Sequence, residues 1–217
     1  IIDVILEAIS ENKGSILVFL PGEGEIIKLA SSLTNKLPGN CHVFPLYGRL
    51  NFKDQQKAIK PISNGQKIVL ATNVAETSLT IEGIETVIDS GLSKRSIYDP
   101  NSGLARLVTQ KISKSEANQR MGRAGRLHPG ICYKLWSKAQ DGSFSDFPPS
   151  EIENSDLTPF ALELALWGSN INELALLTRP KKKALSEAYQ VLEMLGAVNK
   201  QLHITKNGRS LSKIPLH

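Results

Sequence analysis

The chain has 217 residues, 41% of them hydrophobic and 22% charged, and its 26 Lys and Arg outnumber its 21 Asp and Glu to give a net charge of +5. This composition excludes intrinsic disorder and a collagen-like fibre, and the length suffices for one complete core and part of a second. Cys41 and Cys132 have no CxxC or histidine-rich spacing around them, which argues against a disulfide scaffold or a zinc ribbon.

No apolar run approaches the roughly 18 residues of a membrane helix and no charged-then-apolar leader opens the chain, so we expect a soluble protein that is not exported and has no membrane partner. The cysteine usage favours a reducing, cytoplasmic compartment. The chain opens at Ile1 without Met and is already in helical periodicity, with apolar residues at Ile2, Ile5 and Ile9. We therefore expect a fragment of a longer protein.

The positive charge is concentrated between residues 94 and 126. This window holds eight basic and two acidic side chains, a net charge of +6, and the rest of the chain therefore sums to −1. Such a concentration is expected of a segment that contacts phosphate groups. A solvated face is the ordinary alternative, because runs of charge usually lie on the surface.

In chain order, apolar runs of strand length alternate with amphipathic stretches. We predict helices at 25–33 and 53–60 and strands at 15–20, 41–47, 67–72, 85–89 and 130–136. Nearly continuous apolar strands separated by helices indicate a parallel sheet covered on both faces, so the fold class is α/β, doubly wound. Turn-forming residues at 99–103, flanked by strand-like arms, predict a hairpin over 95–113 that projects from the sheet.

The composition changes after about residue 137, where a turn-rich connector leads into helical sequence. Helices are predicted at 157–167 and 181–195, followed by a short two-stranded wing at 197–204. Helix, helix and wing form the outline of a winged-helix unit. We therefore predict a sheet domain at 1–140 and a connector with the winged-helix unit at 141–217.

The strongest chemical signal is Gln119-Arg-Met-Gly-Arg-Ala-Gly-Arg126. Arg123 and Arg126 are three residues apart, which on a helix would place them on one face. Two guanidinium forks beside small residues suit a γ-phosphate whose charge spreads over three oxygens during transfer, and Gln119 could orient a water nucleophile. The alternative is a solvated basic helix paired with acidic neighbours, but within a turn the sequence offers only Glu116.

A second signal is the hydroxyl-rich loop after the strand at 67–72. Five residues of this loop could donate hydrogen bonds to phosphate oxygens, namely Thr72, Asn73, Thr77, Ser78 and Thr80. In open α/β sheets ligands bind at the carboxyl ends of the strands, where this loop begins. Capping of the following helix is the alternative for any single residue, but five of them within nine positions favour a ligand loop.

Two blocks carry a family resemblance, ATNVAETSLTIEG from Ala71 and QRMGRAGR from Gln119. Together with 16–22, 45–48 and the trailing helical unit, they resemble motifs IV, V and VI of superfamily 2 helicases of the DEAH/RHA group. The pattern is most similar to that of bacterial HrpB-type ATP-dependent helicases, and the resemblance covers nearly the whole chain. It implies that residues 1–140 form the second RecA-like domain of such a helicase. The remainder would begin its winged-helix and ratchet region.

The resemblance also implies roles for individual residues. The γ-phosphate of ATP would face Gln119, Arg123 and Arg126, the two arginines acting as fingers, and Ser78 would sense the nucleotide state. The nucleic-acid backbone would contact Gly48, Arg49, Thr72 and Asn73, and the hairpin would guide or separate the strand. Thr80 and Glu82 would lie at the ribose, although eukaryotic relatives usually have Asp where Glu82 stands. Ile59 aligns with an aromatic residue that stacks on adenine in those relatives, and it can offer only apolar contact.

Two parts of a complete ATP site are not found in the sequence. No GxxxxGK[ST] segment occurs, and no Asp-Glu pair for Mg2+ precedes residue 80 at a strand end. We therefore expect ATP with Mg2+ to bind between this domain and a first RecA-like domain of the same protein, which would supply most of the Mg2+ ligands. The fragment alone should then be inactive as an NTP hydrolase. Single-stranded nucleic acid is the expected partner, RNA being favoured and DNA possible.

The competing hypothesis is a non-catalytic nucleic-acid-binding or partner-docking module that uses the basic window as its footprint. A flavodoxin-like small-molecule domain would share the fold class, but it leaves the arginine block unexplained.

Overall fold

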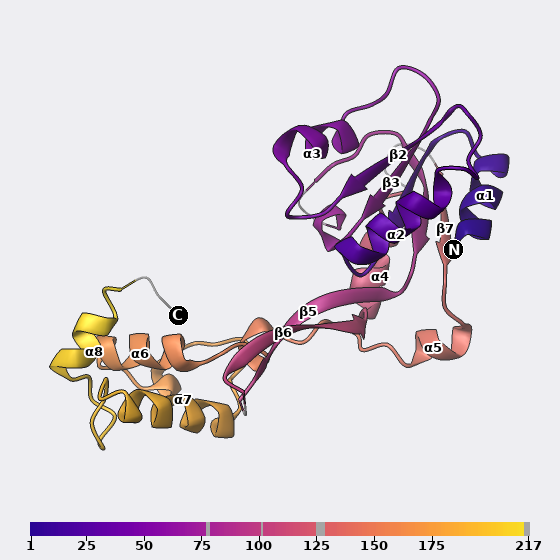
Figure 1. The fold of residues 1–217 in the computed structure, drawn as a ribbon. Helices are drawn as coiled ribbons and strands as arrows, with labels where there is room; N and C mark the ends of the chain where they lie inside the picture. Colours follow the sequence, from indigo (N-terminus) through magenta and orange to yellow (C-terminus); the bar gives the residue numbers. More distant parts are fainter. Residues whose placement is uncertain (77–78, 101, 125–128, 215–217) are drawn as a thin grey trace. The chain divides into compact units, whose positions relative to one another are not determined.

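A computed structural model describes residues 1–76, 79–100, 102–124 and 129–214 of the chain (Figure 1). The chain divides into two compact units, which we call the first unit (Ile1–Arg95 and Thr109–Pro148) and the second unit (Ser96–Val108 and Pro149–His217). Within the described ranges, no helix is long and apolar enough to cross a membrane.

The first unit is built on a five-stranded sheet in the order β2-β3-β1-β4-β7, in which every neighbouring pair is parallel. The strands are β1 (Ser15–Phe19), β2 (Cys41–Leu46), β3 (Gln66–Ala71), β4 (Ile84–Asp89) and β7 (Ile131–Lys134). The predicted parallel α/β sheet is therefore confirmed.

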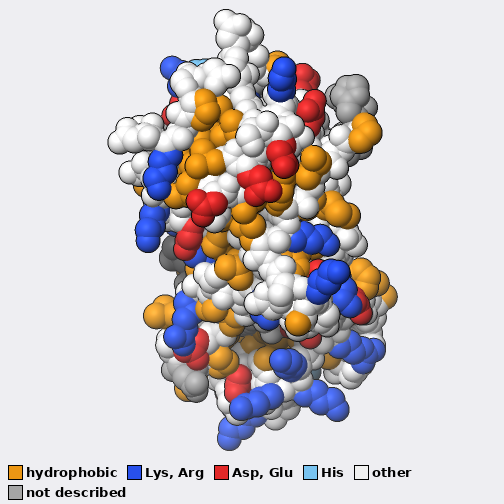
Figure 2. Space-filling model, turned by 90° about the vertical axis from the view of Figure 1, so that its right-hand side faces the viewer, with side chains coloured by type: hydrophobic (Ala, Val, Ile, Leu, Met, Phe, Trp, Pro, Cys, Tyr) orange, Lys and Arg blue, Asp and Glu red, His pale blue; other side chains and the backbone are white. Residues whose placement is uncertain are grey.

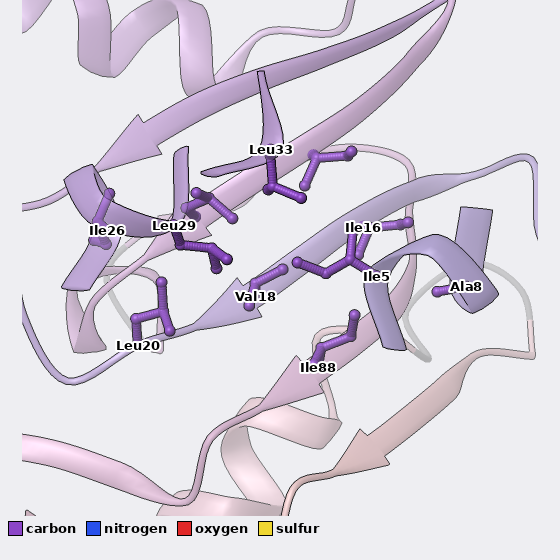
Figure 3. Close-up of a cluster of buried hydrophobic side chains, with 11 residues drawn as sticks. Ile5, Ala8, Ile16, Val18, Leu20, Ile26, Leu29, Leu33 and Ile88 are labelled. Atoms are coloured by element: carbon purple, nitrogen blue, oxygen red, sulfur yellow. The ribbon is translucent and has the colours of Figure 1, made fainter. Parts of the chain in front are cut away.

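Helices cover both faces of this sheet. They are α1 (Ile2–Glu11), α2 (Glu23–Leu33), α3 (Phe52–Ile59) and α4 (Lys114–Met121), with a short α5 (Lys138–Gly142) after the last strand. In β1, Ile16 and Val18 pack against α1 and α2, as Figure 3 shows, whereas Leu17 and Phe19 belong to the cluster on the opposite face. Because a buried parallel strand must be apolar on both sides, β1 is a continuous apolar run rather than an alternating one.

The predicted hairpin is present as a two-stranded sheet of β5 (Leu92–Asp99) and β6 (Leu104–Lys111). Gly103 has φ +65° and donates its N–H to the carbonyl of Asp99 over 2.9 Å, which closes the turn. The tip of the hairpin belongs to the second unit, where the Tyr98 N–H donates to the carbonyl of Asn154 over 2.8 Å.

The second unit is otherwise mostly helical, with α6 (Thr158–Trp167), α7 (Lys182–Met194), α8 (Lys206–Leu211) and short 3-10 turns at Glu151–Glu153 and Ile171–Glu173. Its small core is formed by Leu157, Ala161, Ala165, Ala188, Leu192, Ala197 and Val198. A single antiparallel bridge joins Val198 and Ile204, at the position of the predicted wing. The assignment of this unit to the winged-helix class stays a prediction.

The first unit extends past residue 140 to Pro148. Phe144 explains this extension, because its buried ring packs with Ile112, Ala117 and Trp136. The exposed Lys114 and Asp146 form an ion pair over 2.8 Å beside this cluster. The connector that the sequence places after residue 140 therefore returns to the sheet unit before the chain leaves it.

Replacing Gly65 with Ala is expected to destabilise the first unit. Gly65 has φ +89°, and a Cβ there would lie 2.2 Å from the carbonyl oxygen of Asn40. The left-handed backbone costs a non-glycine residue about 1–2 kcal/mol, so the free energy of unfolding should fall by at least that amount. Urea unfolding followed by Trp136 fluorescence, in a chain with Trp167 replaced by Phe, measures the change.

Gly24→Ala is the matched control. Gly24 lies within α2, a Cβ there would meet nothing within 4 Å, and Ala is the better helix former. This variant should be at least as stable as the parent, and equal stability of the Gly65 and Gly24 variants would contradict the interpretation.

Candidate nucleotide and nucleic-acid site

Two loops meet at the carboxyl edge of the sheet, after β2 and β3. The first is a turn closed by the Leu50 N–H on the Tyr47 carbonyl at 3.1 Å, with Gly48 and Arg49 exposed at its centre. The second begins at Thr72, whose N–H donates to the carbonyl of Leu46 over 3.1 Å. Because parallel strands end at one edge, the structure brings together Gly48, Arg49, Thr72 and Asn73, the four residues assigned to the nucleic-acid backbone.

The second loop continues as a 3-10 turn, η1 (Asn73–Ala75). Thr72 precedes this turn as its N-cap residue, but the threonine side chain makes no capping hydrogen bond there. Capping therefore does not account for this threonine, and Asn73 beside it is exposed. Both side chains lie where a polymer backbone could reach them. Ser78 and Thr77, later in the same loop, lie outside the described residues.

The arginine segment begins on α4, whose start is fixed by a capping box between Ser113 and Glu116. Gln119 is exposed on the last turn of this helix, whereas Arg120, one residue further round, is fully buried. The helix ends at Met121 with Gly122 as its C-terminal cap. The expectation that Arg123 lies on a face of this helix is therefore wrong, because the chain has left the helix by that point. Arg126 lies outside the described residues.

Arg123 is buried, with only 8% of its surface exposed, and its guanidinium holds the hydroxyl-rich loop. Its Nε donates to the carbonyl of Glu76 over 2.9 Å and its Nη1 to the carbonyl of Leu79 over 2.7 Å, while Nη2 also donates to Glu76. In this structure Arg123 therefore binds the backbone on both sides of residues 77–78. A guanidinium that serves two carbonyls fixes the path of the loop through directed hydrogen bonds.

Arg120 forms a buried ion network that sequence reasoning missed. Its Nη1 lies 2.8 Å from the Asp89 carboxylate and 3.2 Å from the Leu92 carbonyl, and its Nε lies 3.2 Å from the Glu76 carboxylate. Its guanidinium also lies over the Phe19 ring, 4.9 Å from the centroid. The sequence contains one signal, since Arg120 follows the apolar Ala117 by three residues and would share its face on a helix, and the structure shows that this face is buried.

Burial raises the pKa of both acidic members of this network, Glu76 and Asp89, and the charge of Arg120 opposes that rise. A buried carboxylate is costly unless a cation and hydrogen bonds compensate it. Asp89 gains one such bond from the Gly91 N–H at 2.9 Å. The network therefore needs all three charged groups in place.

The basic window of the sequence is largely neutralised in the fold. Five of its cations pair with acidic groups: Lys94 with Glu25, Arg95 with Glu116, Arg106 with Asp99, Lys114 with Asp146, and Arg120 with Glu76 and Asp89. On the face drawn in Figure 2, basic, acidic and apolar side chains are interspersed over the upper part of the molecule. The +6 window is thus not an uncompensated basic footprint.

A cavity of about 750 Å³ opens in the first unit near the amino ends of β1, β3 and β4. Thr80, Glu82 and Arg123 line it, as do Pro61 and Ile62, so the structure brings three of the assigned nucleotide residues together. Ile59 does not line this cavity; it is half-buried at the end of α3, and the neighbouring Pro61 and Ile62 supply the apolar wall instead. Thr80 and Glu82 are both exposed to solvent.

Lys67 also lines this cavity and was not singled out from the sequence, although a lysine inside an apolar strand is a recognisable signal. Its Nζ donates to the carbonyls of Lys57 and Lys60 at 3.2 and 2.5 Å and lies 5.1 Å from the Phe44 ring centroid. Burial lowers its pKa to about 8. Lys67 therefore ties the C-terminal end of α3 to the sheet.

The donor set fits phosphate and ribose better than a metal ion. Arginine side chains donate to phosphate oxygens and Glu82 can accept from ribose hydroxyls, whereas Gln119 is not among the described residues that line the cavity. Across the described ranges, no group of three or more His, Cys, Asp or Glu side chains could hold a metal. Thr80 and Glu82 in the cavity thus suit ribose hydroxyls better than a metal ion.

The parallel sheet, its helical layers and the loops at its edges define a RecA-like α/β fold. A crystal structure of the E. coli DExH-box NTPase HrpB has the same fold, with a TM-score of 0.92 and 39% sequence identity over 97% of this chain and 26% of that one. A family model described as the helicase conserved C-terminal domain matches residues 1–128. The chain therefore belongs to that family, and the similarity to HrpB-type helicases of the DEAH/RHA group is confirmed.

Curated relatives agree with this assignment. The chain is 43% identical over 194 residues to the E. coli ATP-dependent RNA helicase HrpB, a match that covers 88% of this chain and 24% of that protein. It is 36% identical over 222 residues to E. coli HrpA, covering 100% of this chain and 17% of HrpA, and 36% identical over 212 residues to mouse DHX33, covering 93% and 30%. The chain thus spans less than a third of the length of each of these relatives.

Replacing Arg120 with Met is expected to lower the free energy of unfolding of the first unit by about 3–5 kcal/mol at pH 7, because two buried carboxylates lose their cation. Without Arg120, the pKa values of Glu76 and Asp89 should rise further. A raised folded-state pKa favours the folded state at low pH and opposes it at high pH. The deficit of the variant should therefore shrink between pH 7 and pH 5 in urea unfolding followed by Trp136 fluorescence.

Lys114→Met is the control on the same helix. Its ion pair with Asp146 is exposed, so the loss should stay below about 1 kcal/mol. Equal losses for the two variants, or a deficit at Arg120 that does not change with pH, would count against the buried network.

Proposed function

We propose that this chain is the second motor domain of an ATP-dependent RNA helicase, together with the start of a following winged-helix region. One observation carries the proposal, namely the course of the loop from Thr72 to Glu82. The loop begins at the carboxyl edge of the sheet, beside Gly48 and Arg49. It ends at the cavity that Arg123 also lines. Candidate groups for a nucleic-acid backbone and for a nucleotide therefore lie on one continuous segment.

RNA is the proposed polymer because the relatives are named as RNA helicases. Contacts from Arg49, Thr72 and Asn73 would go to phosphate and sugar, which position a strand without reading its sequence. The hairpin of β5 and β6 would guide or separate that strand. Movement would follow from alternating closure and opening of two RecA-like domains around the nucleotide.

A first RecA-like domain of the same protein would supply the Walker A and Walker B groups and most of the Mg2+ ligands. In this chain, Gln119, Arg123 and Arg126 would hold the terminal phosphate, Ser78 would lie near it, and Thr80 and Glu82 would hold the ribose beside the apolar wall at Pro61 and Ile62. Arg123 would have to exchange its carbonyl partners for phosphate oxygens on closure. Bound ATP would supply the free energy of phosphoryl transfer.

The proposal is tested in the full-length protein that contains this chain. Arg126→Ala should reduce RNA-stimulated ATP hydrolysis by about 10³-fold or more, the usual worth of an arginine finger, with RNA affinity retained. Arg49→Ala should instead weaken RNA binding and reduce its salt dependence, because a phosphate contact is lost. Lys28→Ala, on the exposed side of α2, is the control for removing a surface cation.

Hydrolysis that Arg126→Ala leaves intact would reject the finger role and favour a non-catalytic nucleic-acid-binding or partner-docking module. The purified 217-residue chain should show negligible ATP hydrolysis with or without RNA, since it lacks a Walker A segment. Substantial turnover by the chain, lost on Arg126→Ala, would overturn the division of the site between two domains.

A further inference from the structure

We propose that Glu76 is a positioning residue that couples the nucleotide side of the first unit to its nucleic-acid side. The proposal rests on the function proposed above and adds a residue to which no role has been given so far. It follows from the hydrogen-bond partners of Glu76, which come from both sides of the loop.

The polar groups of Glu76 are bound by two functional segments, the start of its own loop and the arginine segment on and after α4. Its N–H donates to the carbonyl of Asn73 over 2.9 Å, on the nucleic-acid side. Its carboxylate accepts from Arg120 at 3.2 Å, and Arg120 directly follows Gln119 on α4. Its carbonyl accepts from Arg123 Nε at 2.9 Å. Glu76 is thus a three-way junction between the two candidate sites.

The junction has a fixed end and a movable end. Arg120 is held by the Asp89 carboxylate at 2.8 Å, at the end of β4, and by the Leu92 carbonyl at 3.2 Å, at the start of β5, so its guanidinium is anchored to both strands. Glu76 lies in the loop and accepts a hydrogen bond from Arg120 Nε at 3.2 Å. A change at the junction would therefore move the loop rather than the sheet.

The path from the junction to the nucleic-acid side is short. Asn73–Ala75 form one 3-10 turn, and the Glu76 N–H closes it on Asn73. When Arg123 exchanges the Glu76 carbonyl for phosphate, Glu76 would lose one of its three hydrogen-bonded contacts. The change would reach Asn73 through this turn.

Burying the charge of Glu76 is unfavourable for folding unless a specific partner compensates it. It is 8% exposed, burial raises its pKa, and Asp89 and Glu116 are further negative charges in its surroundings. A neutral residue of similar size would avoid this desolvation cost. The interaction with Arg120 is therefore the main compensation for burying this charge.

The test measures coupling rather than stability. In the full-length protein, RNA affinity is measured with and without a non-hydrolysable ATP analogue, and the ratio of the two affinities is the coupling factor. Glu76→Gln keeps the size and one acceptor but removes the charge, and it should bring this factor at least fivefold closer to one. By reciprocity, the effect of RNA on analogue affinity should change by the same factor.

Glu25→Gln is the matched control, because it removes the carboxylate of another ion pair of the first unit, with Lys94 at 2.9 Å. It should leave the coupling factor unchanged. Glu76→Asp is the second variant, since it keeps the charge but withdraws it from Arg120, and it decides the matter if Glu76→Gln does not fold. Circular dichroism and thermal melting establish folding for each variant.

The outcomes are distinguishable. A wild-type protein whose RNA affinity ignores the nucleotide would reject the proposed function itself. Coupling in the wild type that folded Glu76 variants retain in full would overturn only the role of Glu76, leaving it a purely structural residue. Loss of coupling in Glu25→Gln as well would also overturn that role, because any lost ion pair would then have the same effect.

Discussion

The first unit depends on one constraint, the compensation of a fully buried arginine. The charge of Arg120 cannot stay in the interior without partners, and those partners come from the end of β4 and from the loop after β3. Helix, strand and loop are therefore fixed together by the need to satisfy a single guanidinium. The directed bonds from Arg120 to Asp89 and Glu76 join α4 to the end of β4 and to the loop after β3.

The parallel sheet supplies the second level of organisation. Its strands end at one edge, so the loops after β2 and β3 are neighbours, and the Thr72 N–H bond to Leu46 fixes their spacing. The same loop then returns along the unit to reach the cavity lined by Thr80 and Glu82. Under the proposed function, a nucleic-acid backbone and a nucleotide would both contact this one segment.

The fold class followed from the sequence because runs such as Ile16–Phe19 are apolar on both faces and alternate with helical stretches, a pattern typical of a covered parallel sheet. The ion pairs were harder to predict, because Lys94 pairs with Glu25 across 69 residues of sequence and Arg120 pairs with Glu76 across 44. The charge count over residues 94–126 leaves out such distant partners, and it therefore overstated the uncompensated positive charge. The helical placement of Arg123 failed for a local reason, because Gly122 ends α4 one residue earlier.

The hairpin prevents a simple division of the chain into two separately expressed units. Because its tip belongs to the second unit, the backbone passes from one unit to the other three times, after Arg95, Val108 and Pro148. A truncation at Pro148 would remove the carbonyl of Asn154 that the Tyr98 N–H binds. A single nick or a single cloning boundary therefore cannot yield two intact halves, and expression of either unit by itself would require grafting or shortening the hairpin arms.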